Sequence, residues 1–133
     1  MAKILIIDDD PDFIETYTII LKGGDYEVIS ALNGEEGLAK IQEEKPDLVV
    51  LDVMMSTEYE GFDVARKIRE DLNLRKLPIL MISSIHSVKE VPYRFAPDDT
   101  YLPVDLWMDK PVDPAAFLEK VQKALGDMPQ QAG

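Results

Sequence analysis

The chain has 133 residues, of which 46% are apolar and 30% are charged, a composition typical of one globular domain and not of a disordered or fibrous chain. Its 14 basic and 26 acidic residues give a net charge of −12, which disfavours direct binding to nucleic acid or anionic lipid. The absence of cysteine and the single histidine, His86, exclude disulfides, thiolate metal sites and sites with two imidazoles.

The predicted elements alternate between strands and helices along the chain. Compact apolar runs without polar alternation are typical of strands covered on both faces, and two weaker runs bring the predicted number to five. In chain order, the strands are expected at Ile4–Ile7, Val28–Ile29, Leu48–Leu51, Ile79–Ile82 and Leu106–Met108. Apolar residues at helical spacing predict helices from Pro11 to Lys22, from Asn33 until Pro46, from Phe62 to Leu72 and from Asp113 to Gly126.

This alternation predicts a doubly wound α/β fold with a five-stranded parallel sheet, because right-handed crossovers place helices on both faces of such a sheet. Asp10 is a candidate N-cap, and Asn33 with Glu36 resembles a capping box. The segment from Val88 to Pro103 contains three prolines, so we expect at most a turn or two of helix there, followed by irregular chain. The first apolar run is too short for a signal peptide or a membrane span, which favours a cytoplasmic protein.

Polar residues gather where the predicted strands end, and ligands bind outside the carboxyl ends of strands in open parallel sheets. These residues are Asp8, Asp9, Asp10, Asp52, Ser83, Ser84 and Lys110. Neighbouring strands would bring carboxylates, a hydroxyl and an ammonium to one edge of the sheet. Such carboxylates repel one another unless a cation lies among them, and Mg²⁺ accepts one or two carboxylates together with a phosphoryl oxygen. The pattern therefore indicates phosphoryl transfer to an aspartate.

Four short motifs occur in order along the chain. They are Ile-Leu-Ile-Ile-Asp-Asp-Asp-Pro at 4–11, Leu-Val-Val-Leu-Asp-Val-Met-Met at 48–55, Pro-Ile-Leu-Met-Ile-Ser at 78–83 and Lys-Pro at 110–111. Together they resemble the receiver domain of response regulators in two-component signalling, from Lys3 to about Leu125. The resemblance implies a flavodoxin-like fold, and the prolines predict an irregular, proline-interrupted segment in place of the regular fourth helix of the family. It also implies a domain over residues 3–125 and a flexible tail over residues 126–133.

The resemblance implies that Asp52 accepts a phosphoryl group from a histidine kinase or a histidine phosphotransfer protein. Asp8 and Asp9 would hold Mg²⁺ or Mn²⁺ together with Asp52 and the backbone carbonyl of Met54. The protein would catalyse only its own phosphorylation and dephosphorylation, and would therefore not be an enzyme in the usual sense.

Further roles follow from the same resemblance. Lys110 matches the invariant lysine of the family, Ser83 its switch hydroxyl and Trp107 its switch aromatic residue. Phosphorylation would favour a second conformation that an output partner binds, with the chain a monomer or a phosphorylation-dependent homodimer. Because only a short tail follows the last predicted helix, we expect a receiver without an output domain.

The chain also departs from the family pattern. Ser56 stands where the family usually has proline, and the stretch 86–105, which begins at His86, is longer than usual. Met54 and Ile85 flank the path of attacking water in the family, and both are bulky and apolar. They predict a long-lived phosphoryl group on Asp52.

Two other functions fit parts of the same pattern. Asp8, Asp9 and Asp10 after a strand resemble the nucleophile motif of haloacid-dehalogenase-like phosphatases, in which Asp8 would be the nucleophile. That family's usual Gly-Thr is absent, and the short chain leaves little room for a substrate-gating cap. A phosphorylation-independent interaction module built on the proline-containing stretch is the other alternative, and the intact acidic cluster argues against it.

Overall fold

The structure is a computed structural model that describes residues 2–52, 60–70, 72, 76–84, 106–110 and 112–126. Its strands are β1 (Lys3–Ile7), β2 (Glu27–Ala31), β3 (Leu48–Asp52), β4 (Ile79–Ser84) and β5 (Leu106–Lys110). Its helices are α1 (Pro11–Gly23), α2 (Gly34–Glu44), α3 (Glu60–Glu70) and α5 (Pro114–Gly126).

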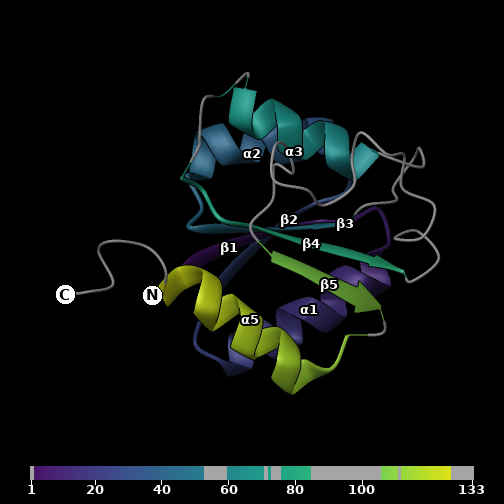
Figure 1. The fold of residues 1–133 in the computed structure, drawn as a ribbon, viewed down its shortest axis with the longest axis vertical. Helices are drawn as coiled ribbons and strands as arrows, with labels where there is room; N and C mark the ends of the chain where they lie inside the picture. Colours follow the sequence, from purple (N-terminus) through teal and green to yellow (C-terminus); the bar gives the residue numbers. More distant parts are fainter. Residues whose placement is uncertain are drawn as a thin grey trace.

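The strands form one five-stranded sheet in the order β2-β1-β3-β4-β5, and each neighbouring pair is parallel. Figure 1 shows three layers, with α2 and α3 on one face of the sheet and α1 and α5 on the other. The chain reverses its direction of strand addition after β2, so β1 and β3 lie side by side at the centre of the sheet. The predicted doubly wound α/β fold with a parallel sheet is confirmed. The predicted irregular segment in place of a fourth helix lies outside the described residues.

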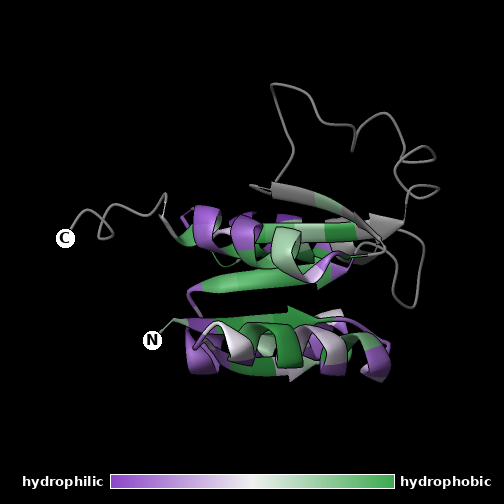
Figure 2. Cartoon of the chain, turned by 90° about the horizontal axis from the view of Figure 1, so that it is seen from below, coloured by the Kyte–Doolittle hydropathy of each residue, from purple (hydrophilic) through white to green (hydrophobic). Residues whose placement is uncertain are grey.

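Strand residues alternate between two apolar cores, one on each face of the sheet. On β1, Leu5 and Ile7 pack in the core under α2 and α3, whereas Ile4 and Ile6 pack in the core under α1 and α5. Figure 2 shows strands that are mostly hydrophobic and helices along which hydrophilic and hydrophobic residues alternate. Because both faces are covered, the inner strands β1, β3 and β4 read as continuous apolar runs.

The helix N-termini are fixed by the side chains that the sequence analysis identified. The Asp12 backbone N–H donates to Asp10 Oδ1 at 2.9 Å, and the Glu36 N–H donates to Asn33 Oδ1 at 2.8 Å. In a capping box, the Glu36 side chain would accept from the backbone N–H of the N-cap residue Asn33. Here Glu36 Oε1 accepts instead from the N–H of Leu32, one residue before the cap. Both N-caps are confirmed, and Asp10 is thereby engaged in holding the start of α1.

Both boundaries of α3 differ from the prediction. α3 begins at Glu60 and ends at Glu70, so Leu72 lies beyond the helix although it packs against the core under α2 and α3. Leu72 fits the apolar spacing of the helix because its side chain packs against the same core, although the helix itself ends two residues earlier. α5 ends at Gly126, as the apolar spacing predicts, and residues 127–133 of the predicted tail lie outside the described part of the chain.

Candidate acidic site at the carboxyl edge of the sheet

Asp8 and Asp52 stand level with each other on the two central strands. Ile7 of β1 pairs with Leu51 of β3, so the next residue on each strand is an aspartate. Both aspartates follow residues of the core under α2 and α3, and strand alternation therefore places them on the face that carries α1 and α5. The order of the strands thus brings two carboxylates from distant parts of the sequence to one edge of the sheet.

Asp9 completes a cluster of three carboxylates. One oxygen from each of Asp8, Asp9 and Asp52 lies within 4.8 Å of the others. Asp8 and Asp52 are only 2% and 5% exposed, whereas Asp9 is exposed to solvent. The cluster therefore consists of two buried carboxylates and one at the surface.

Backbone hydrogen bonds orient the first aspartate. Asp8 Oδ1 accepts from the backbone N–H of Asp10 at 2.9 Å, and the Asp8 N–H donates to the carbonyl of Ala31 at 3.1 Å. The second bond extends the ladder between β1 and β2 by one residue, and the first ties the carboxylate to the turn that begins α1. Asp8 is thus held between the end of a strand and the start of a helix.

Three carboxylates at this separation favour a divalent cation. Their mutual repulsion is large in a partly buried site, and a cation that bridges them removes it. Mg²⁺ prefers oxygen ligands and is bound in proteins by one or two carboxylates while it keeps several waters. The buried pair with an exposed third carboxylate fits this ion, since one side of the cluster stays open to water and to a phosphoryl oxygen. Asp8, Asp9 and Asp52 are the described residues that could hold it.

The structure describes the backbone of three further predicted site residues. Ser83 pairs with Asp109, and Ser84 pairs with Lys110, so Ser83 and Lys110 lie at the carboxyl ends of adjacent strands. This is the same edge of the sheet as the acidic cluster, because Asp52 pairs with Ile82, the residue before Ser83. Trp107 pairs with Met81 on β5, which is an edge strand. Met54, Ile85 and His86 lie outside the described residues.

Tyr17 lies on the apolar face of α1, and the sequence pattern assigns it no role in the site. Tyr17 is 2% exposed, and no group in the described part of the chain forms a hydrogen bond with its hydroxyl. Burial, and then the charges of Asp8, Asp52 and Asp10, raise the pKa of Tyr17 above its ordinary value. The only sequence signal was a hydroxyl-bearing residue at a core position of the helix.

Comparisons with known proteins decide the family. The family model described as the response regulator receiver domain matches residues 4–122. The chain belongs to the response regulator receiver family. The receiver domain predicted from the four motifs is therefore confirmed.

The receiver is similar to both curated proteins and solved structures. It is 31% identical over 125 residues to the DNA-binding dual master transcriptional regulator RpaA of Synechocystis sp., covering 94% of this chain and 49% of RpaA. The chain thus spans about half the length of that relative. The chemotaxis protein CheY4 of Vibrio cholerae is 29% identical, with a TM-score of 0.79 and coverage of 94% of this chain and 99% of that one.

A third similar protein was solved with a metal and a fluoride complex. The response regulator protein TrrA of Thermotoga maritima, in complex with Mg²⁺ and BeF, is 30% identical, with a TM-score of 0.76. The match covers 94% of this chain and 100% of TrrA. These neighbours confirm a flavodoxin-like fold of the CheY type.

Receiver domains share several general properties. Receivers are phospho-accepting modules of two-component signalling, bind Mg²⁺ at an acidic pocket and are not enzymes in the usual sense. Their homologues interact with histidine kinases and with output partners. The family match favours neither the phosphatase nor the phosphorylation-independent module considered above. Among the described residues, none of the helices has the length and apolar character needed to cross a membrane.

Proposed function

We propose that this receiver accepts a phosphoryl group on Asp52 from the phosphohistidine of a histidine kinase or a histidine phosphotransfer protein. The observation that carries the proposal is the clustering of Asp8, Asp9 and Asp52, with a carboxylate oxygen of each within 4.8 Å of the others. A single strand-end aspartate could serve many roles, but three carboxylates from two strand ends form a site for a cation and an acceptor. The solved complex of TrrA with Mg²⁺ and BeF supports this interpretation.

Asp52 is proposed as the acceptor because it ends the central strand β3 and is 5% exposed. In the transfer, an Asp52 carboxylate oxygen attacks phosphorus, the phosphorus–nitrogen bond of the donor breaks, and the electron pair of that bond returns to the donor imidazole nitrogen, which carries or takes up one proton from solvent so that a neutral imidazole leaves. Partial burial limits the access of water to the acyl phosphate that results. The products are an aspartyl phosphate and an unmodified histidine.

The other two carboxylates are proposed to hold Mg²⁺ together with Asp52 and the backbone carbonyl of Met54. When bound, this ion neutralises the negative charge of the acceptor and of the incoming phosphoryl group. Asp8 is oriented by the Asp10 N–H, so the turn that starts α1 also positions a ligand. Asp9 is exposed and therefore faces the solvent from which the ion and its waters arrive.

Lys110 and Ser83 are proposed to contact the oxygens of the transferred phosphoryl group, and Trp107 to report the switch. Support comes from the strand register, which places the backbones of Ser83 and Lys110 at the edge that holds the acidic cluster. The modified site would favour a second conformation that an output partner binds. We place this exchange in the cytoplasm, with the receiver a monomer or a phosphorylation-dependent homodimer.

The test is chemical phosphorylation followed by intact-mass spectrometry. Incubation with acetyl phosphate and Mg²⁺ should add the mass of one phosphoryl group to the wild-type protein, and hydroxylamine should remove it because acyl phosphates are labile. Asp52→Asn should accept nothing. Glu15→Gln, which removes an exposed carboxylate on α1 outside the cluster, should behave like the wild type.

Two results would overturn the proposal. Modification of Asp52→Asn to the wild-type extent would show that another residue accepts the group. If Asp8→Asn, and not Asp52→Asn, abolished both this modification and the hydrolysis of p-nitrophenyl phosphate, Asp8 would be the nucleophile of a phosphatase.

A further inference from the structure

Among the residues that the structure describes, the buried hydroxyl of Tyr17 has no hydrogen-bond partner. A buried polar group that makes no hydrogen bond is costly, and phenylalanine would fill the same space without that cost. The ring itself needs no hydroxyl, because it packs in the apolar core under α1 and α5. Packing alone therefore does not explain why this position is tyrosine and not phenylalanine.

Two aromatic neighbours hold the ring in place. The ring centroids of Tyr17 and Phe13, one turn earlier on α1, are 6.0 Å apart and the rings are stacked. The Phe117 ring of α5 lies 5.2 Å away on a tilted plane. With contacts from both helices and a side chain that is 2% exposed, the hydroxyl cannot swing out to solvent.

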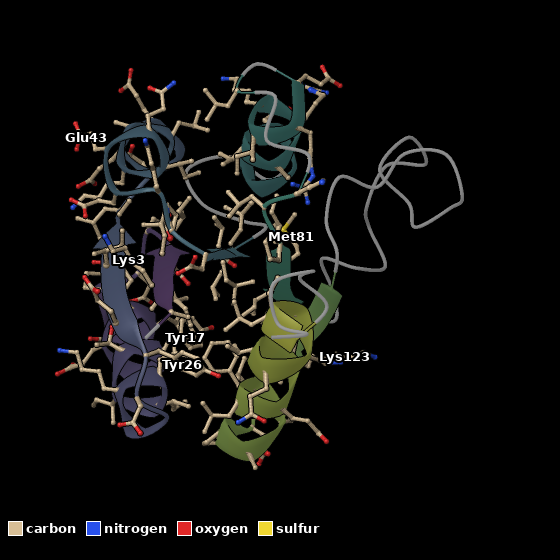
Figure 3. All side chains as sticks on the ribbon, turned by 90° about the vertical axis from the view of Figure 1, so that its left-hand side faces the viewer. Lys3, Tyr17, Tyr26, Glu43, Met81 and Lys123 are labelled. Atoms are coloured by element: carbon tan, nitrogen blue, oxygen red, sulfur yellow. The ribbon has the colours of Figure 1, made fainter. Side chains whose placement is uncertain are left out.

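The acidic cluster lies on the same face of the sheet as this hydroxyl. Asp8 and Asp52 follow the alternation of their strands onto the face covered by α1 and α5, where Tyr17 is buried. The negative charges of the carboxylates disfavour the phenolate form of Tyr17. After burial, the charge of Asp8 is the largest cause of the raised pKa of Tyr17, and the charge of Asp52 is the next. Tyr26 packs against the same core, but its pKa is raised by burial alone. Figure 3 labels both tyrosines on the α1 and α5 side of the sheet, across from Met81.

We propose that Tyr17 is a positioning residue of the acidic site, whose neutral hydroxyl donates through one bridging water to the carboxylate of Asp8. The inference rests on the proposed function, because it assigns a hydrogen-bond donor to a carboxylate that would hold Mg²⁺. The backbone N–H of Asp10 already donates a hydrogen bond to Asp8 Oδ1. A second donor, the Tyr17 hydroxyl acting through the water, would help to hold the Asp8 carboxylate in its orientation toward the cation.

The experiment compares Tyr17→Phe with Tyr26→Phe, each of which removes only a hydroxyl. Calorimetric titration with MgCl₂ alone should give binding about tenfold weaker for Tyr17→Phe than for the wild type, the lower end of the effect of losing a group that orients a metal ligand. Tyr26→Phe should bind as the wild type does. Circular dichroism verifies that both variants are folded, and the infrared carboxylate band of the metal-free protein should shift only in Tyr17→Phe.

Different results separate this inference from the proposed function. Equal Mg²⁺ affinity and equal carboxylate bands in Tyr17→Phe and the wild type, with a more stable Tyr17→Phe fold, would show that the hydroxyl is a packing defect and overturn the inference alone. A wild-type protein that binds no Mg²⁺ would overturn the metal site itself, and the role of Tyr17 with it.

Discussion

Asp8 and Asp52 occupy matching positions on neighbouring parallel strands, and both carboxylates are buried at the same edge of the sheet. Their charges, together with that of Asp9, lie close enough to repel one another strongly. The protein has a net charge of −12, so its overall field offers no compensation. Repulsion between the three carboxylates therefore destabilises the folded state, and a bound cation would remove this destabilisation.

Mg²⁺ should stabilise the folded protein. A ligand that binds only the folded state adds about 2.7 kcal/mol to the free energy of unfolding when present at about a hundred times its dissociation constant. Urea unfolding in MgCl₂ and in EDTA, at equal ionic strength, measures this difference. The gain should disappear in Asp9→Asn, and an equal gain in that variant would assign the effect to salt instead of to the cluster.

Gly37 of α2 should not tolerate a side chain. A Cβ at this position would meet the buried Ile7 side chain, with Cγ1 at 2.8 Å, and overpacking of this kind costs about 1–3 kcal/mol. Helix propensity returns up to about 1 kcal/mol, so Gly37→Ala should lower the free energy of unfolding by roughly 1 kcal/mol. Gly23→Ala is the control, because no atom of the described ranges lies within 4 Å of its Cβ position. Equal stability of the two variants in urea would refute the close approach of α2 to β1.

Stability should fall at alkaline pH through Tyr17. The folded state raises the pKa of this phenol, so above about pH 10 the unfolded chain loses the proton while the folded chain keeps it. The unfolded state is then favoured, and the wild type should lose about 1.4 kcal/mol per pH unit relative to Tyr17→Phe. Urea titrations of both proteins between pH 9 and about pH 11 test this prediction. Parallel pH profiles would contradict it.

The phosphoryl group on Asp52 should be comparatively long-lived. Met54 and Ile85, two residues after the acceptor and two after Ser83, are bulky and apolar and should hinder the approach of water. After removal of acetyl phosphate, decay followed on Phos-tag gels should be several-fold slower in the wild type than in the Met54→Asn/Ile85→Glu variant. Equal decay rates would remove this role for the two side chains.

Local signals in the sequence were sufficient to predict much of the fold. Doubly covered strands are uniformly apolar, and the caps at Asp10 and Asn33 depend on contacts within four residues, so both could be predicted without tertiary information. The capping bond from Leu32 to Glu36 and the end of α3 before Leu72 depend on the exact path of the backbone. Sequence patterns place such boundaries only to within a few residues.

The acidic cluster was predictable for a topological reason. Carboxyl ends of neighbouring parallel strands must meet, so aspartates at the ends of β1 and β3 converge once these strands are adjacent. The environment of Tyr17 was not predictable, because a tyrosine on an apolar helix face gives no sign of whether its hydroxyl reaches solvent. Only the packing of α1 against α5 and the sheet shows that this residue is buried on the face of the sheet that also carries Asp8 and Asp52.

The most direct test of the account is a crystal structure of the protein with beryllofluoride and Mn²⁺, whose anomalous signal locates the ion. The account predicts one Mn²⁺ bound by Asp8, Asp9 and Asp52, with the beryllofluoride on the carboxylate of Asp52. Beryllofluoride on Asp8, or an ion bound away from these three carboxylates, would contradict it.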